Sequence, residues 1–106
     1  MPDNRTPSLY EIRLTRQMLR NAKADVRWRL NIFTFCRRNH GSSLVTDAVL
    51  EHHSNALRNV LSDVNDVFGI HSAQSDLEAQ ADFVISELQY FDRRPNELLQ
   101  TFNPLS

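Results

Sequence analysis

The stretch that decides the fold is SLYEIRLTRQMLRNAKADVRWRLNIFTFCRR, residues 8–38. It contains no glycine and no proline over 31 residues, so it can form one uninterrupted helix. Ser8 and Glu11 have the spacing of a capping box at its start. Arg37 and Arg38 lie in its last turn, where cations stabilise the negative end of the helix dipole. The stretch therefore predicts a single helix about 46 Å long.

A second amphipathic helix is predicted after Gly41, over about residues 43–68. Leu50, Leu57 and Val64 recur in it every seven residues, with polar residues on the opposite side. This periodicity is typical of a helix that buries one face.

The third and fourth predicted helices occupy the rest of the chain. Ser75 and Glu78 again have capping-box spacing, and an apolar residue follows every three or four positions up to residue 94. Pro95 ends the third helix and is suited to the first position of a short helix reaching Phe102.

These segments predict an all-α fold, a long-helix bundle of three main helices plus a short C-terminal helix, completed by dimerisation. A length of 106 residues suits one domain, and two glycines and four prolines are too few for a sheet of many short strands. We expect a flexible arm over residues 1–7, a helical bundle domain over 8–94, and a short C-terminal helix with a tail over 95–106.

The expected homodimer follows from the first helix. A compact globule of this size is about 34 Å across, less than the length of the helix. Its apolar residues also form two stripes, and a helix with two apolar faces packs against two neighbours. Helices from both subunits would then pack together, with a monomeric three-helix bundle as the alternative. The first stripe, expected at the dimer interface, is Ile12, Leu19, Val26, Leu30 and Phe33, and the second is Leu14, Met18, Ile32 and Cys36.

The net charge of −1 hides a strong asymmetry along the chain. Residues 1–40 carry nine basic and three acidic side chains, a net +6, whereas residues 41–106 carry three basic and ten acidic ones, a net −7. Such asymmetry points to nucleic acid, a membrane surface or a charged protein partner. No apolar run approaches the length of a membrane helix, so we expect no membrane partner.

Basic residues of the first helix form a row on one of its faces. Five of them recur at steps of three and four, within roughly 80° of arc, with no acid interleaved on that face. A straight row of cations neutralises several phosphates of a duplex without reading its bases. The expected nucleic-acid-binding residues, called the basic row below, are Arg13, Arg16, Arg20, Lys23, Arg27, Arg37 and Arg38.

Two alternatives to nucleic acid stay open for the basic row. It fits an acidic protein partner, as in an adaptor, inhibitor or assembly factor. It also fits acids of the later helices within the chain, namely Asp63, Asp66, Asp76, Glu78, Asp82 and Glu87. Trp28 and Phe35 border the row, where they would stack on bases, but core packing is favoured for both. Few aromatic residues then remain exposed, which favours a duplex over single strands.

The first interpretation is therefore a non-enzymatic protein that contacts the backbone of a duplex, RNA before DNA. The layout of long helices with a basic face is similar to small viral helical dimers that bind double-stranded RNA and suppress silencing. This is an analogy of architecture without matched residues.

No pattern in the sequence indicates a catalytic residue, a cofactor or a metal site. Cys36 is the single cysteine and falls on an apolar side, which favours an inert buried thiol. His52 and His53 are adjacent rather than one turn apart, unlike zinc ligands on a helix, and a hydrogen-bonded core position is favoured for His53. Asp25 and Arg29 have the spacing of an ion pair that would fix register in an interface. With no secretory signal visible, we expect a cytoplasmic, reducing environment.

Overall fold

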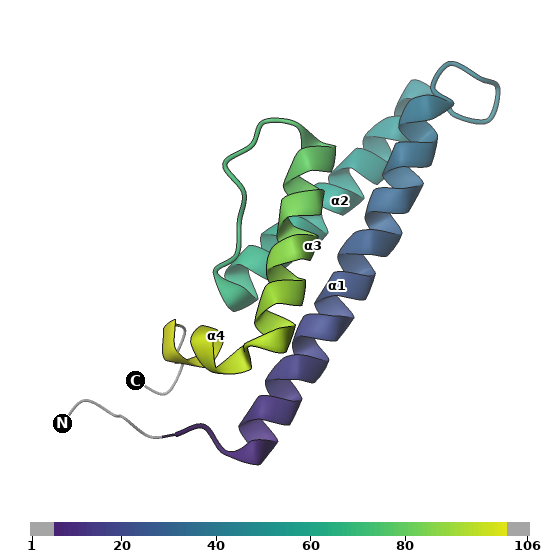
Figure 1. The fold of residues 1–106 in the computed structure, drawn as a ribbon. Helices are drawn as coiled ribbons and strands as arrows, with labels where there is room; N and C mark the ends of the chain where they lie inside the picture. Colours follow the sequence, from purple (N-terminus) through teal and green to yellow (C-terminus); the bar gives the residue numbers. More distant parts are fainter. Residues whose placement is uncertain (1–5, 102–106) are drawn as a thin grey trace.

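The computed structural model describes residues 6–101, which form four helices. These are α1 (Leu9–Arg38), α2 (Asp47–Phe68), α3 (Leu77–Arg93) and α4 (Pro95–Thr101). α2 runs back beside α1, a loop returns along the molecule, and α3 then runs in the same direction as α2 (Figure 1). No strand occurs in this part of the chain, and the predicted bundle of three main helices plus a short C-terminal helix is confirmed.

The molecule is elongated, with extents of 60 × 22 × 17 Å and a radius of gyration of 16.5 Å. A compact chain of this length has a radius of gyration of about 13 Å. α1 has 30 residues and is about 45 Å long, so it fits within the long dimension of its own chain. The helices lie side by side along one axis instead of folding into a sphere, so the length of α1 does not by itself require a second subunit.

The helix starts are set by side chains that accept backbone hydrogen bonds. Ser8 caps α1 as predicted, with its hydroxyl oxygen accepting from the N–H of Glu11 at 3.1 Å. α3 is capped by Asp76 and not by Ser75, since the Asp76 carboxylate accepts from the N–H of Ala79 at 3.0 Å. The second predicted capping box is thus displaced by one residue, because an aspartate stands next to the serine and is an equally good cap.

α2 begins at Asp47, capped by Thr46, and not near Ser43. The intervening residues form a turn that buries Val45, and this contact fixes the chain outside a helical conformation. α2 ends where predicted, because Gly69 adopts a left-handed conformation with φ +70°.

The core runs along the axis of the molecule and is entirely apolar among the described residues. Leu19 and Val26 of α1 are completely buried, as are Leu57 of α2 and Leu88 of α3. α2 and α3 both pack mainly against α1 and touch each other little. The cluster comprises Leu19, Val26, Leu30, Phe33, Leu57, Val60, Val64, Phe68, Ile70, Leu77, Ala81, Val84, Ile85, Leu88 and Leu98.

The residues expected at a dimer interface lie inside this single-chain core. Leu19, Val26, Leu30 and Phe33 are buried against the chain's own helices, and Ile12 is half-buried. Four of the five are covered within the single chain, where α2 and α3 are the neighbours of α1, and only Ile12 keeps part of its surface accessible. No second copy is needed to bury this stripe.

α4 turns back at the end of α3, and its buried Leu98 belongs to the core. Pro95 is its first residue, as predicted. The predicted end of this helix at Phe102, the tail beyond it, and most of the arm over residues 1–7 lie outside the described residues. Within residues 6–101, no helix combines the length and apolar character that a membrane span requires.

Candidate nucleic-acid interface

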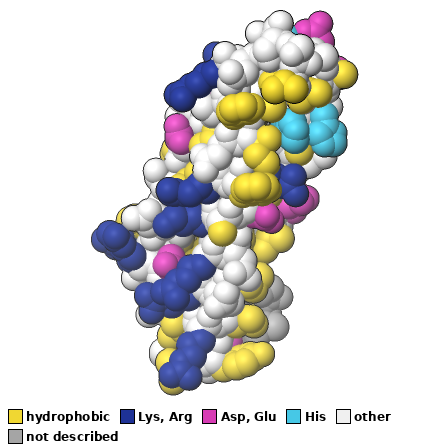
Figure 2. Space-filling view, turned by 90° about the vertical axis from the view of Figure 1, so that its right-hand side faces the viewer, with side chains coloured by type: hydrophobic (Ala, Val, Ile, Leu, Met, Phe, Trp, Pro, Cys, Tyr) yellow, Lys and Arg dark blue, Asp and Glu magenta, His cyan; other side chains and the backbone are white. Residues whose placement is uncertain are grey.

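The basic row follows one edge of α1 at the surface, as the dark blue side chains of Figure 2 show. From Arg13 to Arg38 it extends over about 37 Å of the helix axis. Arg16 and Lys23 are half-buried, and the other five residues of the row are exposed. The periodicity of the sequence thus places these cations on one side of the molecule, as expected from helical spacing.

The middle of the basic row is held by two residues of α3. The Nε of Arg20 donates to both carboxylate oxygens of Asp92, at 3.1 and 3.2 Å, and the Nε of Arg16 donates to Oδ1 at 3.4 Å. The Nζ of Lys23 donates to the side-chain oxygen of Gln89 at 3.3 Å. One carboxylate therefore neutralises part of the charge of two neighbouring guanidinium groups.

The C-terminal end of α1 has a second ionic contact with α3. The Nη1 of Arg37 donates to Glu78 at 2.8 Å and to Asp76 at 3.3 Å. The hydrogen bond and charge of Glu78, followed by the charge of Asp76, raise the pKa of Arg37 above its ordinary value. Thr34 donates to the other oxygen of Glu78 at 3.3 Å. Arg37 is thus permanently charged and paired within the chain.

The partners of the basic row all come from α3 or its N-cap. Asp76 and Glu78 were among the acids expected to pair with it, but Asp92 was not. Asp92 lies 72 residues from Arg20 in the sequence, so no local pattern signals this contact. Only the antiparallel packing of α3 on α1 brings the two together.

Three residues of the basic row, called the open cations below, have no ion pair or hydrogen bond from their side chains within residues 6–101. Arg20 is intermediate, because it is 57% exposed and contacts Asp92 through Nε alone. Its two terminal nitrogens face no partner in the described part of the chain, so they can still donate to an external anion. The open cations are Arg13, Arg27 and Arg38.

Trp28 and Phe35 are exposed on α1, at 61% and 60%, although core packing was favoured for both. At 100° per residue they lie roughly 80° around the helix from Arg27 and Arg38, on the side away from α2 and α3. Figure 2 shows hydrophobic side chains beside the dark blue ones on this face. The exposed apolar residues on this side of α1, called the outer strip below, are Tyr10, Leu14, Met18, Trp28 and Phe35.

The remaining candidates from the sequence form no second site. Asp25 is exposed and Arg29 half-buried, and among the described residues no ion pair joins them. His53 is half-buried and packs edge-on against His52, with no hydrogen bond from its ring to another described residue. Cys36 is buried, as predicted. No group of three or more His, Cys, Asp or Glu side chains within residues 6–101 is arranged to hold a metal ion.

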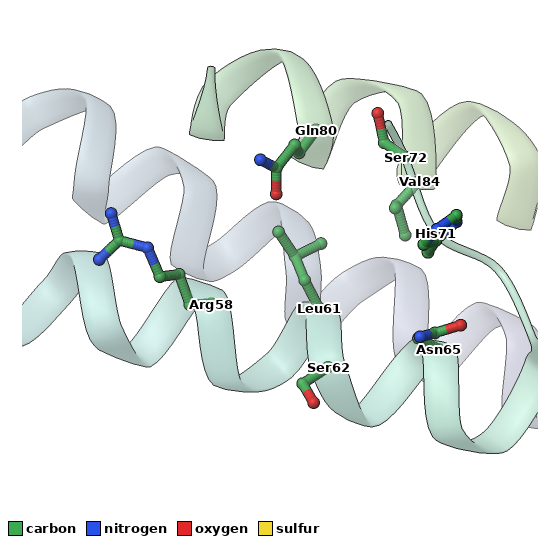
Figure 3. A pocket seen from close by; sticks show the side chains of 8 residues that line it. All are labelled: Arg58, Leu61, Ser62, Asn65, His71, Ser72, Gln80 and Val84. Atoms are coloured by element: carbon green, nitrogen blue, oxygen red, sulfur yellow. The ribbon is translucent and has the colours of Figure 1, made fainter. Parts of the chain in front are cut away.

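A pocket of about 270 Å³ opens between α2, α3 and the loop that joins them. Leu61 of α2 and Val84 of α3 point toward each other across it (Figure 3). Arg58 and His71 are among its polar lining residues, but the basic row on α1 contributes nothing to it. It is a consequence of the sparse contact between α2 and α3 and is separate from the candidate interface.

No protein-family model matches the chain, and no curated protein or solved structure matches it either. The charge and exposure of the α1 surface are therefore the features that bear on function.

Proposed function

We propose that this chain is a non-enzymatic nucleic-acid-binding protein that contacts the phosphate backbone through the basic row of α1. The observation that supports this is the line of exposed guanidinium groups formed by Arg20 and the open cations over about 37 Å. A nucleic-acid strand carries a phosphate about every 3.4 Å along its axis, so several phosphates face such a line at once. Contacts of this kind position a ligand without reading its sequence.

Duplex RNA is the first ligand to test. A straight row of cations suits the regular backbone of a stiff duplex, which supports this choice. Trp28 and Phe35 are exposed, so a lack of exposed aromatic residues no longer favours a duplex over a single strand. Single strands therefore belong in the same experiment.

The test is a salt-dependent binding titration with the double variant R13E/R27E. Both residues are exposed and unpaired within the described chain, so the variant should keep its helicity by circular dichroism. We expect it to lose duplex and single-strand binding, and the wild type to show a linear fall of log K with log salt. R58E/R93E is the matched control, because Arg58 on α2 and Arg93 on α3 are exposed outside the basic row and the double variant changes the net charge equally. A folded R13E/R27E protein that binds like the wild type would exclude the basic row as the interface.

A second candidate is a protein-interaction module, and the observation that favours it is the outer strip. Exposed tryptophan and tyrosine next to arginine is the residue composition of protein–protein hot spots. An acidic helix or a second copy of the chain would fit this face, and the homodimer now depends on this strip. The measurement is the mass in solution by light scattering. A dimer that dissociates in L14D, where Leu14 lies on the outer strip, would support this candidate.

A further inference from the structure

We infer that Trp28 and Phe35 stack on unpaired bases, so that the nucleic acid bound by the basic row is single-stranded. This rests on the proposed function and changes its ligand from a duplex to a single strand. The inference comes from where the two rings lie, since each is about three-fifths exposed on the same helix as the basic row.

The rings and the cations form two parallel lines on α1. Trp28 and Phe35 are seven residues apart, about 10 Å along the axis, which is about three nucleotides of a stacked strand. Arg27 and Arg38 run alongside, roughly 80° around the helix. A strand whose phosphates follow the arginines would place its bases over the two rings.

The surface between the two lines carries short side chains. Ala24 and Asn31 lie at angular positions between the arginines and the rings, and both are exposed. Short side chains let a sugar–phosphate backbone approach the helix, and the amide of Asn31 has a donor and an acceptor for a base edge. A nucleotide has an apolar base face and an anionic phosphate, which match an apolar line beside a cationic one.

A paired duplex does not satisfy this arrangement. Its bases are stacked on each other inside the helix, so flat rings at the protein surface meet only sugars and phosphates. The N-terminal half of α1 carries one ring on the outer strip, the exposed Tyr10, about 27 Å from Trp28 along the axis, and its other members there, Leu14 and Met18, are aliphatic. Among the described residues of the outer strip, two rings within reach of neighbouring bases occur only in the C-terminal half of α1. The inferred base-binding segment is therefore the C-terminal half of α1, from Arg27 to Arg38.

The experiment uses the intrinsic fluorescence of Trp28, which is the only tryptophan of the chain. The full-length protein is titrated with a single strand of about 13 nucleotides, which matches the length of α1 at about 3.4 Å per nucleotide. The same titration is made with a blunt duplex of that sequence and with an abasic strand. Binding is followed independently by the anisotropy of a labelled strand, and the mass of the free protein by light scattering.

We expect the single strand to quench Trp28 at saturation and the abasic strand to bind without quenching. W28L should weaken single-strand binding about tenfold, W28F should retain most of it, and duplex binding should change less than twofold in both. Leu14→Ala is the control, since it shortens the outer strip without removing a ring. Because Trp28 is largely exposed, these variants should remain helical by circular dichroism.

Three outcomes would overturn the inference. Anisotropy that reports binding while Trp28 fluorescence stays constant would exclude stacking and leave the proposed backbone contact intact. A dimeric free protein in which acrylamide does not quench Trp28 would show that a second copy covers the rings. Absence of binding by any strand or duplex would overturn both the inference and the proposed function.

Discussion

Arg20 and Asp92 are joined by two hydrogen bonds, from the Nε of the guanidinium to both carboxylate oxygens, at 3.1 and 3.2 Å. The same carboxylate accepts from Arg16 at 3.4 Å. A row of cations that is free of acids on its own helix therefore faces an acid from α3 at its centre. Any anionic ligand of α1 competes with Asp92 for these guanidinium groups.

Asp92→Asn should change stability and binding in opposite directions. The contact is partly exposed, with Asp92 at 21% and Arg20 at 57%, so solvent screening limits its loss to no more than about 1 kcal/mol of unfolding free energy. Release of two arginines should strengthen nucleic-acid binding a few-fold. The slope of log K against log salt should steepen by the amount expected for about one additional phosphate contact. Urea denaturation and a salt-dependent titration measure the two effects.

Asp82→Asn is the matched control for this variant, because Asp82 is exposed on the same helix and forms no ion pair within residues 6–101. It should change the overall charge equally and leave stability and the salt slope nearly unchanged. If Asp82→Asn and Asp92→Asn strengthen binding to the same extent, the effect is one of net charge and the competition by Asp92 is excluded.

Leu19→Ala should destabilise the fold by about 2–5 kcal/mol, because Leu19 is completely buried in the core between α1 and its neighbours. Val26→Asp should unfold the chain, since it buries an unpaired charge. Leu14→Ala, on the outer strip, should cost no more than about 0.5 kcal/mol. Denaturation midpoints at two protein concentrations provide the check. A midpoint that rises with concentration in the wild type but not in Leu19→Ala would place Leu19 in an intermolecular contact instead.

Gly69→Ala should destabilise the protein by about 1 kcal/mol. The cost is conformational, since φ is +70° and no atom lies within 4 Å of the added methyl group. Gly69→Asn should cost less, because asparagine tolerates the left-handed region better than alanine. Thermal melts of the two variants distinguish the alternatives. Equal losses would show that the cost arises from something other than the backbone angle.

Cys36 should react with a thiol reagent only when the chain unfolds, because it is buried, with 4% of its surface exposed. Cys36→Ala should therefore leave nucleic-acid binding unchanged, with a modest packing loss of about 1 kcal/mol. Reaction rates with and without urea test the first statement, and the binding titration tests the second. Rapid labelling of the native protein would contradict the burial.

The helices were predictable because the signals that form them are local. The absence of glycine and proline over residues 8–38 gives α1, and Ser8 and Gly69 act as caps through their own side chain or backbone angle. Serine and aspartate are equally good N-caps, so the sequence does not distinguish Ser75 from its neighbour Asp76. The capping-box spacing favours Ser75, whereas the structure has Asp76 as the N-cap of α3.

The relation between helices was not predictable in the same way. Helical periodicity groups Trp28 with Phe35, and Leu19 with Val26, but it does not say which group a neighbouring helix covers. The structure resolves this by placing α2 and α3 over the Leu19 stripe. Asp92 reaches the basic row only through that packing, so its role depends on a contact between distant parts of the chain.

Within residues 6–101, the acids and the amide that pair with the basic row all lie on α3 or its N-cap, and this has a thermodynamic consequence. Asp92, Gln89, Glu78 and Asp76 lie on one element that contacts α2 little, so their hydrogen bonds to the basic row form part of the docking free energy of α3. Binding of a polyanion and docking of α3 then oppose each other, because both use the same arginines. By linkage, the bound polyanion weakens the docking of α3 by the same factor by which docked α3 weakens polyanion binding. Amide hydrogens of α3 would accordingly exchange faster in the complex, while those of α1 become better protected. The shortest of the three main helices would thus set how tightly the longest one holds its ligand.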